Sequence, residues 1–236
     1  MTASNAGIVR RARWAPALGT MCLMALGIAG AGPASPALAD AQSPPSMCFD
    51  GPDDCQPQDF DNMFRTKNTP WDCHGNKTLP RRFCQTDNST LTVWRQKSVA
   101  PSGWTRIKEV LKDDFDARTD LKVKFVRKPV YTGDAETDVI YKKPEKFPAG
   151  VVALTWCDNR VDELKCDQHY VLLKGATPSK ELACHETGHA VGLTHGNRAY
   201  PAVSNEDSRL GCLRTPPRVG VQTLGGHNRR MINKTY

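Results

Sequence analysis

Hydrophobic and polar side chains alternate in several short stretches, and this period of two is typical of half-buried β-strands. The clearest case is the run in which Leu121, Val123 and Phe125 alternate with two lysines. Four other short runs are rich in apolar or β-branched residues. The sequence therefore predicts five strands, at residues 91–94, 121–125, 139–141, 151–156 and 169–173.

A period of three to four residues appears between the first two strands and indicates a helix. Its apolar positions are Trp104, Ile107, Leu111 and Phe115. We expect Ser102 to cap this helix and its apolar face to cover the sheet. A strand, a helix and a second strand in this order form a crossover unit, so we expect these two strands to pair in parallel.

A second helix is predicted from residue 178 to about Val191. Thr177 can cap its amino terminus, and Pro178 suits the first turn because no helical N–H is lost there. Apolar residues give this helix a side that can pack on the sheet, namely Leu182, Ala183, Ala190 and Leu193. Residues 228–236 are interpreted as a closing helix.

The first 39 residues follow the three-part plan of a secretory signal peptide. Three arginines, at positions 10, 11 and 13, precede an apolar run over about residues 17–31, and small residues lead to Asp40. We expect cleavage after Ala39. A retained membrane helix is the alternative, but the apolar run is short and interrupted by glycines. No other stretch is apolar enough to span a bilayer.

The charge of the chain argues against nucleic-acid binding. The net charge of +7 falls to +4 once the three arginines of the signal peptide are removed, because that segment contains no acidic residue. The remaining Lys and Arg residues are scattered and form no basic run, as a nucleic-acid footprint would require.

Candidate chemistry is concentrated in one stretch, H-E-T-G-H-A-V-G-L-T-H, which begins at His185. His185 and His189 are four residues apart, so on a helix both imidazoles lie on one face and can bind one metal ion. Glu186 then lies where a general base is needed. Gly192 can adopt a left-handed conformation, which lets the chain turn and bring His195 in as a third ligand. Three ligands leave one zinc position open, as in catalytic sites.

An ordinary alternative exists, in which the histidines are satisfied by hydrogen bonds in a polar core and Glu186 is a solvated helix residue. The chain contains 18 Gly and 6 His in 236 residues. The glycine and the last histidine at their required offsets would therefore arise by chance roughly once in 500 cases. The extended motif favours the metal site.

The pattern H-E-x-x-H-x-x-G-x-x-H is the signature of the metzincin zinc endopeptidases, and this chain resembles them at each of its fixed positions. The resemblance implies an α+β, metzincin-like zincin fold. Such a fold has a five-stranded mixed sheet with a covering helix, a zinc-binding active-site helix and a small C-terminal subdomain. It also implies that Zn²⁺ is bound by His185, His189 and His195, and that Glu186 activates the zinc-bound water. The strand at residues 151–156 would be the edge that pairs with an extended substrate.

The cysteine count fits an exported protein. Of nine cysteines, Cys22 leaves with the signal peptide and eight remain, an even number that predicts four disulfides in an oxidising compartment. No C-x-x-C pair is present, which argues against a zinc finger. We expect Cys157 to pair with Cys166, and Cys184 to pair with Cys212 and so tie the zinc helix to the segment beneath it.

Three parts of the chain are expected: the signal peptide at residues 1–39, a loop-rich, cysteine-containing extension at residues 40–88, and a catalytic domain at residues 89–236. An alternative is that the extension is an inhibitory propeptide with a cysteine switch. The candidate thiol is Cys84, in the sequence Pro-Arg-Arg-Phe-Cys. The spacing differs from that of matrixin switches, and a free Cys84 would leave an odd number of cysteines.

Two departures from the family pattern concern the segment after the motif. Gly196 follows His195, so the residue that distinguishes several subfamilies is absent, and matrixin-like and snapalysin-like proteases both remain open. The methionine expected in the turn beneath the zinc is also missing. Leu213 lies in the expected turn, and Met231 in the tail is the alternative.

These features predict a secreted zinc endopeptidase that acts on protein or peptide substrates. We expect a monomer with neither nucleic-acid binding nor membrane association after signal cleavage. A catalytically inactive, metzincin-like binding module is the alternative, although retention of Glu186 argues against it. Hydrolysis of a non-peptide amide is compatible with the same motif.

Overall fold

The computed structural model describes residues 59–65, 69, 73, 82–217 and 220–236. The predicted signal peptide, together with Cys48 and Cys55, lies outside the described residues. In the part of the chain that is described, no helix is both long enough and apolar enough to cross a membrane.

The described part of the chain contains six strands, three α-helices and three shorter helical segments. The strands are β1 (Gln85–Thr86), β2 (Thr90–Arg95), β3 (Lys122–Phe125), β4 (Val139–Lys142), β5 (Ala153–Arg160) and β6 (Lys165–Leu173). The α-helices are α1 (Pro101–Val110), α2 (Lys180–Ala190) and α3 (Gly225–Thr235). A π-helical segment, η2 (Leu111–Asp116), continues α1, and two 3-10 segments, η3 (Gly196–Arg198) and η4 (Ser208–Leu213), follow α2.

The strands form one sheet of mostly parallel pairing, with the order β1-β6-β4-β2-β3 and with β5 paired antiparallel to β6. The parallel pairing of β2 with β3 confirms the predicted crossover through α1. The five predicted strands are present as β2 to β6, but the prediction of a five-stranded sheet is not confirmed, because β1 adds a sixth. Two residues are too few to show a periodic pattern, which explains why β1 was missed.

The helices α1 and α2 begin at residues other than those predicted from the sequence. The amino terminus of α1 has Ala100 as its N-cap, with Pro101 in the first turn and no side-chain cap, so Ser102 is not the cap. In α2 the cap is Ser179, whose hydroxyl oxygen accepts a hydrogen bond from the amide of Leu182. Thr177 and Ser179 are both suitable capping residues, and the prediction of Thr177 as the cap was wrong.

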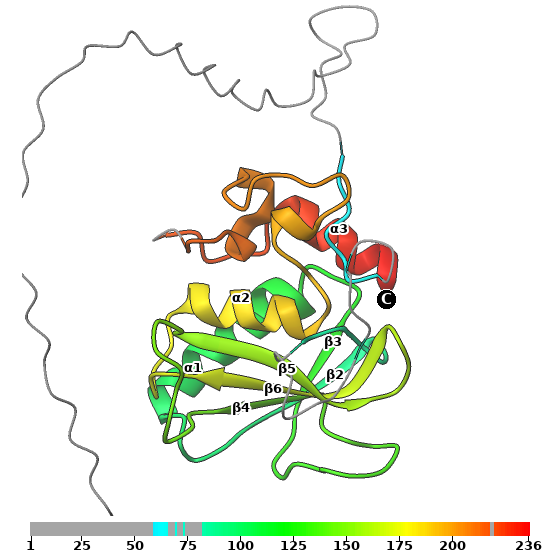
Figure 1. The fold of residues 1–236 in the computed structure, drawn as a ribbon. Helices are drawn as coiled ribbons and strands as arrows, with labels where there is room; N and C mark the ends of the chain where they lie inside the picture. The colour runs from blue at the N-terminus through cyan, green and yellow to red at the C-terminus, as the bar shows by residue number, and fades with distance from the viewer. Residues whose placement is uncertain (1–58, 66–68, 70–72, 74–81, 218–219) are drawn as a thin grey trace, which may run out of the picture. The chain divides into compact units, whose positions relative to one another are not determined.

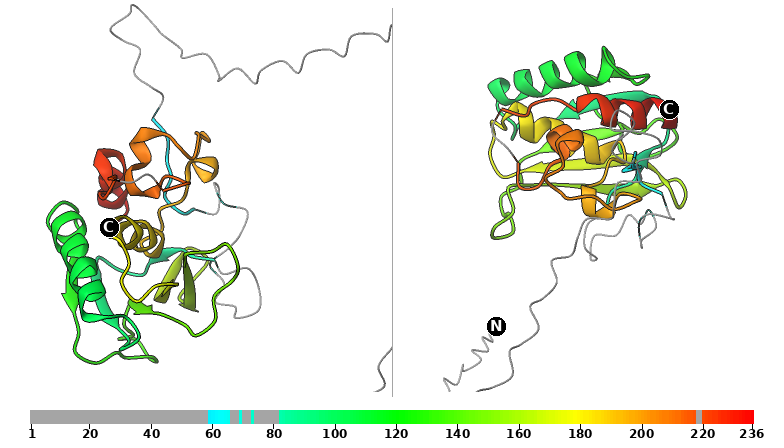
Figure 2. Two further views of the ribbon diagram at one scale, coloured as in Figure 1. Left: turned by 90° about the vertical axis from the view of Figure 1, so that its left-hand side faces the viewer. Right: turned by 90° about the horizontal axis from the view of Figure 1, so that it is seen from above.

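Both α1 and α2 lie on the same face of the sheet, and the C-terminal elements η4 and α3 lie beyond α2 (Figures 1 and 2). A buried carboxylate connects these layers. Asp114 of η2 accepts hydrogen bonds from the backbone amide of Leu224 and from the guanidinium of Arg229, 2.6 Å from Nη2. The closing helix α3 is therefore fixed to the helix that covers the sheet.

The described residues of the predicted extension pack against the rest of the protein. Met63 forms an isolated bridge with Leu193, and the carbonyl of Asn62 accepts a hydrogen bond from the amide of Thr194 at 2.7 Å. Phe60 and Met63 belong to the main hydrophobic core. Residues 59–65 thus brace the segment that runs from α2 to the last histidine of the motif.

Three disulfides join described cysteines. Two of them, Cys157–Cys166 and Cys184–Cys212, confirm the predicted pairs. The third joins Cys73 to Cys84. Cys84 therefore carries no free thiol, and the cysteine-switch alternative does not hold in this structure.

We expect unreduced protein that begins at Asp40 to contain no titratable thiol, because the pairing would also extend to Cys48 and Cys55. Thiol titration under denaturing conditions, before and after reduction, measures this. About eight thiols should appear only after reduction. One free thiol in the unreduced protein would contradict complete pairing.

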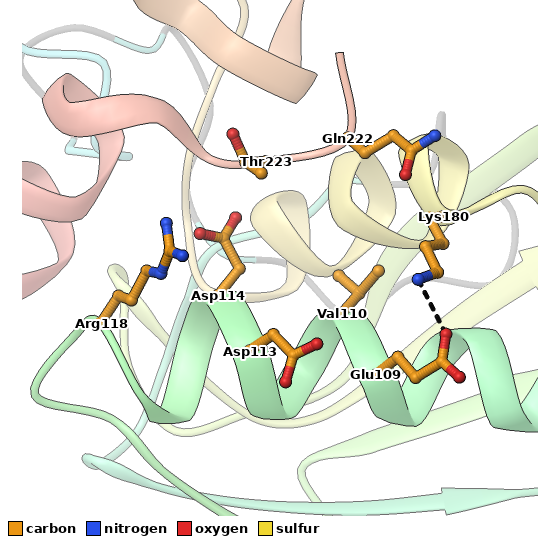
Figure 3. A pocket seen from close by; sticks show the side chains of 8 residues that line it. All are labelled: Glu109, Val110, Asp113, Asp114, Arg118, Lys180, Gln222 and Thr223. Atoms are coloured by element: carbon orange, nitrogen blue, oxygen red, sulfur yellow. Dashed lines mark ion pairs between the residues drawn. The ribbon is translucent and has the colours of Figure 1, made fainter. Parts of the chain in front are cut away.

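A small cavity of about 130 Å³ lies between α1 and the amino-terminal end of α2 (Figure 3). Charged side chains line most of it, and Lys180 forms an ion pair with Glu109 across it, with an N–O distance of 2.8 Å. No residue of the histidine motif lines this cavity. It is therefore separate from the candidate site.

Candidate metal centre

The fold brings the three histidines of the motif together. The Nε2 atoms of His185, His189 and His195 lie 3.1 Å from one another in all three pairs. His185 and His189 project from α2, and His195 arrives from the loop that follows it. This arrangement agrees with the spacing argument for all three residues, whereas metal binding itself remains a prediction.

Hydrogen bonds at the opposite ring nitrogens define the state of two imidazoles. His185 Nδ1 lies 2.8 Å from the carbonyl oxygen of Cys212, and His189 Nδ1 lies 2.7 Å from the carbonyl oxygen of Leu193. A carbonyl can only accept, so each Nδ1 carries the proton and each neutral ring presents an Nε2 lone pair to the cluster. Lone pairs that converge in this way repel each other unless a cation lies between them.

The donor set also suits zinc in its dimensions and charge state. Two nitrogens of a tetrahedral zinc site with bonds of about 2.0–2.1 Å lie about 3.3 Å apart, close to the separation found here. Burial lowers the pKa of His195 to about 4 and, together with the two neighbouring imidazoles, lowers that of His189 well below its ordinary value. Metal ligation requires neutral imidazole, so these rings are ready to bind at neutral pH.

Two glycines make the loop geometry possible. Gly192 ends the helix with φ +92°, as predicted, and a Cβ there would lie 2.9 Å from Met63 Sδ. At Gly196, a Cβ would collide with the backbone carbonyl oxygens of Val203, at 2.8 Å, and Ser204. The position after the third histidine therefore accepts no side chain larger than that of glycine without a shift of the backbone.

Glu186 is 5% exposed, and its carboxylate contacts a side chain of the sheet. Its Oε2 accepts a hydrogen bond from the hydroxyl of Thr155 on β5, at 2.7 Å. Burial raises the pKa of Glu186 to about 7, against the opposing effect of the Thr155 hydrogen bond. Sequence reasoning missed Thr155, because a threonine in a strand carries no signal that it faces a carboxylate 31 residues away.

The segment beneath α2 is built around Leu213. A Cβ at Gly188 would lie 2.8 Å from Leu213 Cδ2, so this leucine packs directly against the helix between the two histidines. The preceding residue, Cys212, supplies the carbonyl that orients His185 and is linked by its disulfide to Cys184. Met231 lies in α3, on another element. The contacts therefore favour Leu213 as the turn residue.

Because this position requires apolar volume, we expect Leu213→Met to keep zinc affinity and activity within a few fold, since such swaps usually cost under about 1.5 kcal/mol. Leu213→Asp should abolish both, because it buries an unpaired carboxylate beneath the helix. Zinc content and peptide hydrolysis of purified variants, with Met231→Leu as the control, measure this. If Met231→Leu lowered zinc content and activity while Leu213→Asp left both unchanged, Met231 of α3 and not Leu213 would be the residue that supports the site.

A further buried histidine, His169, lies in the sheet. His169 lies on β6 with no exposed surface, and its Nε2 is 3.5 Å from the amide of Cys84. Burial lowers its pKa to about 3. It is a neutral structural residue and does not belong to the cluster.

Comparisons with known proteins give little beyond this geometry. No protein-family model matches the chain, and no curated protein matches it. Among solved structures, the chain is similar to high choriolytic enzyme 1, a hatching-enzyme zinc protease from the medaka fish Oryzias latipes, with a TM-score of 0.31 and 15% identity. The match covers 52% of this chain and 56% of the other, so the chain spans about half the length of that protein. At this level the likeness does not by itself define an activity.

Proposed function

We propose that this protein is a secreted zinc-dependent endopeptidase. The observation that carries the proposal is the convergence of three Nε2 lone pairs at 3.1 Å, with Glu186 adjacent to the first of them in the chain and oriented by Thr155. Three neutral imidazoles with a buried carboxylate constitute a catalytic rather than a structural donor set, because one zinc position stays open.

His185, His189 and His195 would hold the metal. Zinc in such a site supplies Lewis acidity, which polarises a carbonyl and makes a water acidic. Glu186 would take the proton of the attacking water and later donate it to the leaving amine. Thr155 limits the rotation of the carboxylate, so that Glu186 stays oriented for both transfers.

The substrate would be a peptide in extended conformation. β5 is the edge strand beside the site, and an edge offers backbone donors and acceptors to an added strand. The scattered charge of the chain gives no reason to expect nucleic acid. The buried disulfides fit an oxidising, extracellular compartment, and we propose that the mature protein acts there as a monomer.

A mixed peptide library tests the proposal directly. Zinc-loaded protein from Asp40 should cleave internal peptide bonds, lose this activity in chelator and regain it when zinc is added. Zinc binding without cleavage of any peptide would favour the inactive binding module. Cleavage confined to non-peptide amides in a parallel panel would favour the amidase alternative.

A further inference from the structure

The open edge of β5 is not uniform along its length. β5 pairs with β6 and with no other strand of the described sheet. The carbonyl of Val152 accepts a hydrogen bond from the amide of Lys174, on the β6 side, at 3.0 Å. Successive residues of a strand turn their backbone groups to opposite sides. The positions that face away from β6 are therefore Ala153, Thr155 and Cys157.

The chain itself already occupies one of these three positions. The amide of Cys157 donates a hydrogen bond to the carbonyl oxygen of Arg82 at 2.8 Å. The next residue, Phe83, stacks its ring on His189 with centroids 4.3 Å apart and an interplanar angle of 27°. Residues 82–84, which we call the strap, thus close one end of the open edge directly beside the metal centre.

The strap is firmly anchored. Cys84 forms a disulfide with Cys73, and the amide of Cys73 donates a hydrogen bond to the carbonyl of Glu163 in the turn between β5 and β6, at 2.9 Å. The sulfur of Cys73 lies 3.6 Å from that of Cys157, so two disulfides pack together in a buried cluster. A substrate strand could displace the strap only by disrupting this cluster.

We propose that the strap is the end wall of the substrate groove and limits the number of residues that a substrate places before the scissile bond. The inference rests on the proposed peptidase function. Thr155 contacts Glu186 and so marks the level of the reacting bond, and the blocked Cys157 lies two strand positions further. At about 3.3 Å per residue, this leaves room for about two substrate residues. Antiparallel addition, the more stable pairing, directs the amino-terminal side of the substrate toward the strap.

Peptide hydroxamates test this wall without any need for turnover, because the hydroxamate binds zinc and so fixes the register of the peptide. One series carries the hydroxamate at the carboxyl end of one to five residues, and the mirror series carries it before one to five residues. Calorimetry on the zinc-loaded protein gives Kd. In the first series, the affinity should stop rising at about two residues. In the mirror series, the affinity should still rise when the third residue is added.

Two variants separate the backbone wall from the aromatic ring. The double variant Cys73→Ser, Cys84→Ser removes the disulfide that anchors the strap. In this variant, the affinity of the first series should keep rising up to about four residues. Phe83→Ala leaves the Arg82 carbonyl in place, so the plateau should stay where it is. A longer plateau in Phe83→Ala would overturn the role of the backbone.

If the affinity of the first series rose by more than about tenfold between two and four residues, the strap would not be an end wall. This measurement uses the wild-type protein, so it holds even if the double variant fails to fold. If neither series binds, the proposed zinc site fails together with the wall. If both series bind and keep tightening, only the wall fails.

Discussion

Replacing Glu186 with glutamine is expected to lower kcat for peptide hydrolysis at least about a hundredfold, the usual contribution of a placed general base, while one zinc ion stays bound. The amide keeps the shape of the side chain and can still accept a hydrogen bond from Thr155. It cannot take a proton from water. Steady-state kinetics together with metal analysis of the same preparation measure both quantities.

Glu145→Gln is the matched control, because Glu145 is exposed in the loop between β4 and β5 and belongs neither to the zinc helix nor to the histidine motif. It should leave kcat within about twofold, as surface substitutions away from special features usually do. Full activity in Glu186→Gln would show that Glu186 is a structural residue and that another group handles the proton. Loss of zinc in that variant would mean that the carboxylate supports the ligands.

Replacing His195 with alanine is expected to remove zinc and activity together. His195 is the third corner of the nitrogen cluster, and only His185 and His189 would remain. Loss of an outer partner of a metal ligand typically costs about 10–100-fold in affinity, so loss of a ligand should cost more. Competition with a chromogenic zinc chelator measures the affinity.

The neighbouring Asn197→Ala is a suitable control, because Asn197 is exposed on η3 and its backbone amide, not its side chain, forms the hydrogen bond to Asn205. It should keep zinc affinity close to that of the wild type. An unchanged zinc content in His195→Ala would remove this histidine from the ligand set and leave a two-histidine site.

The parts of the site that sequence reasoning predicted depend on short chain separations. The four-residue spacing of His185 and His189 places two rings on one helical face wherever that helix packs, and Gly192 needs only its own backbone to turn the chain. Local rules were sufficient for these residues. The disulfide between Cys184 and Cys212 spans 28 residues, and the sequence did not fix this pairing, which was expected because it would tie the zinc helix to the segment beneath it.

The parts that were missed depend on tertiary contacts. Thr155 meets Glu186 because β5 lies beneath α2, and Phe83 reaches His189 from a segment interpreted as a loop-rich extension. Neither residue belongs to a motif. β1 was not predicted for a related reason, because a strand of two residues is defined only by its pairing with β6.

Titrating zinc into chelator-stripped protein while recording the hydrolysis of one cleaved peptide is the most direct test of the central claim. Peptide hydrolysis should be absent without metal, should rise in proportion to added zinc and should reach its plateau at one zinc per chain, because one cluster of three nitrogens holds one ion. Hydrolysis that proceeds in the stripped protein, or that does not respond to zinc, would contradict the account.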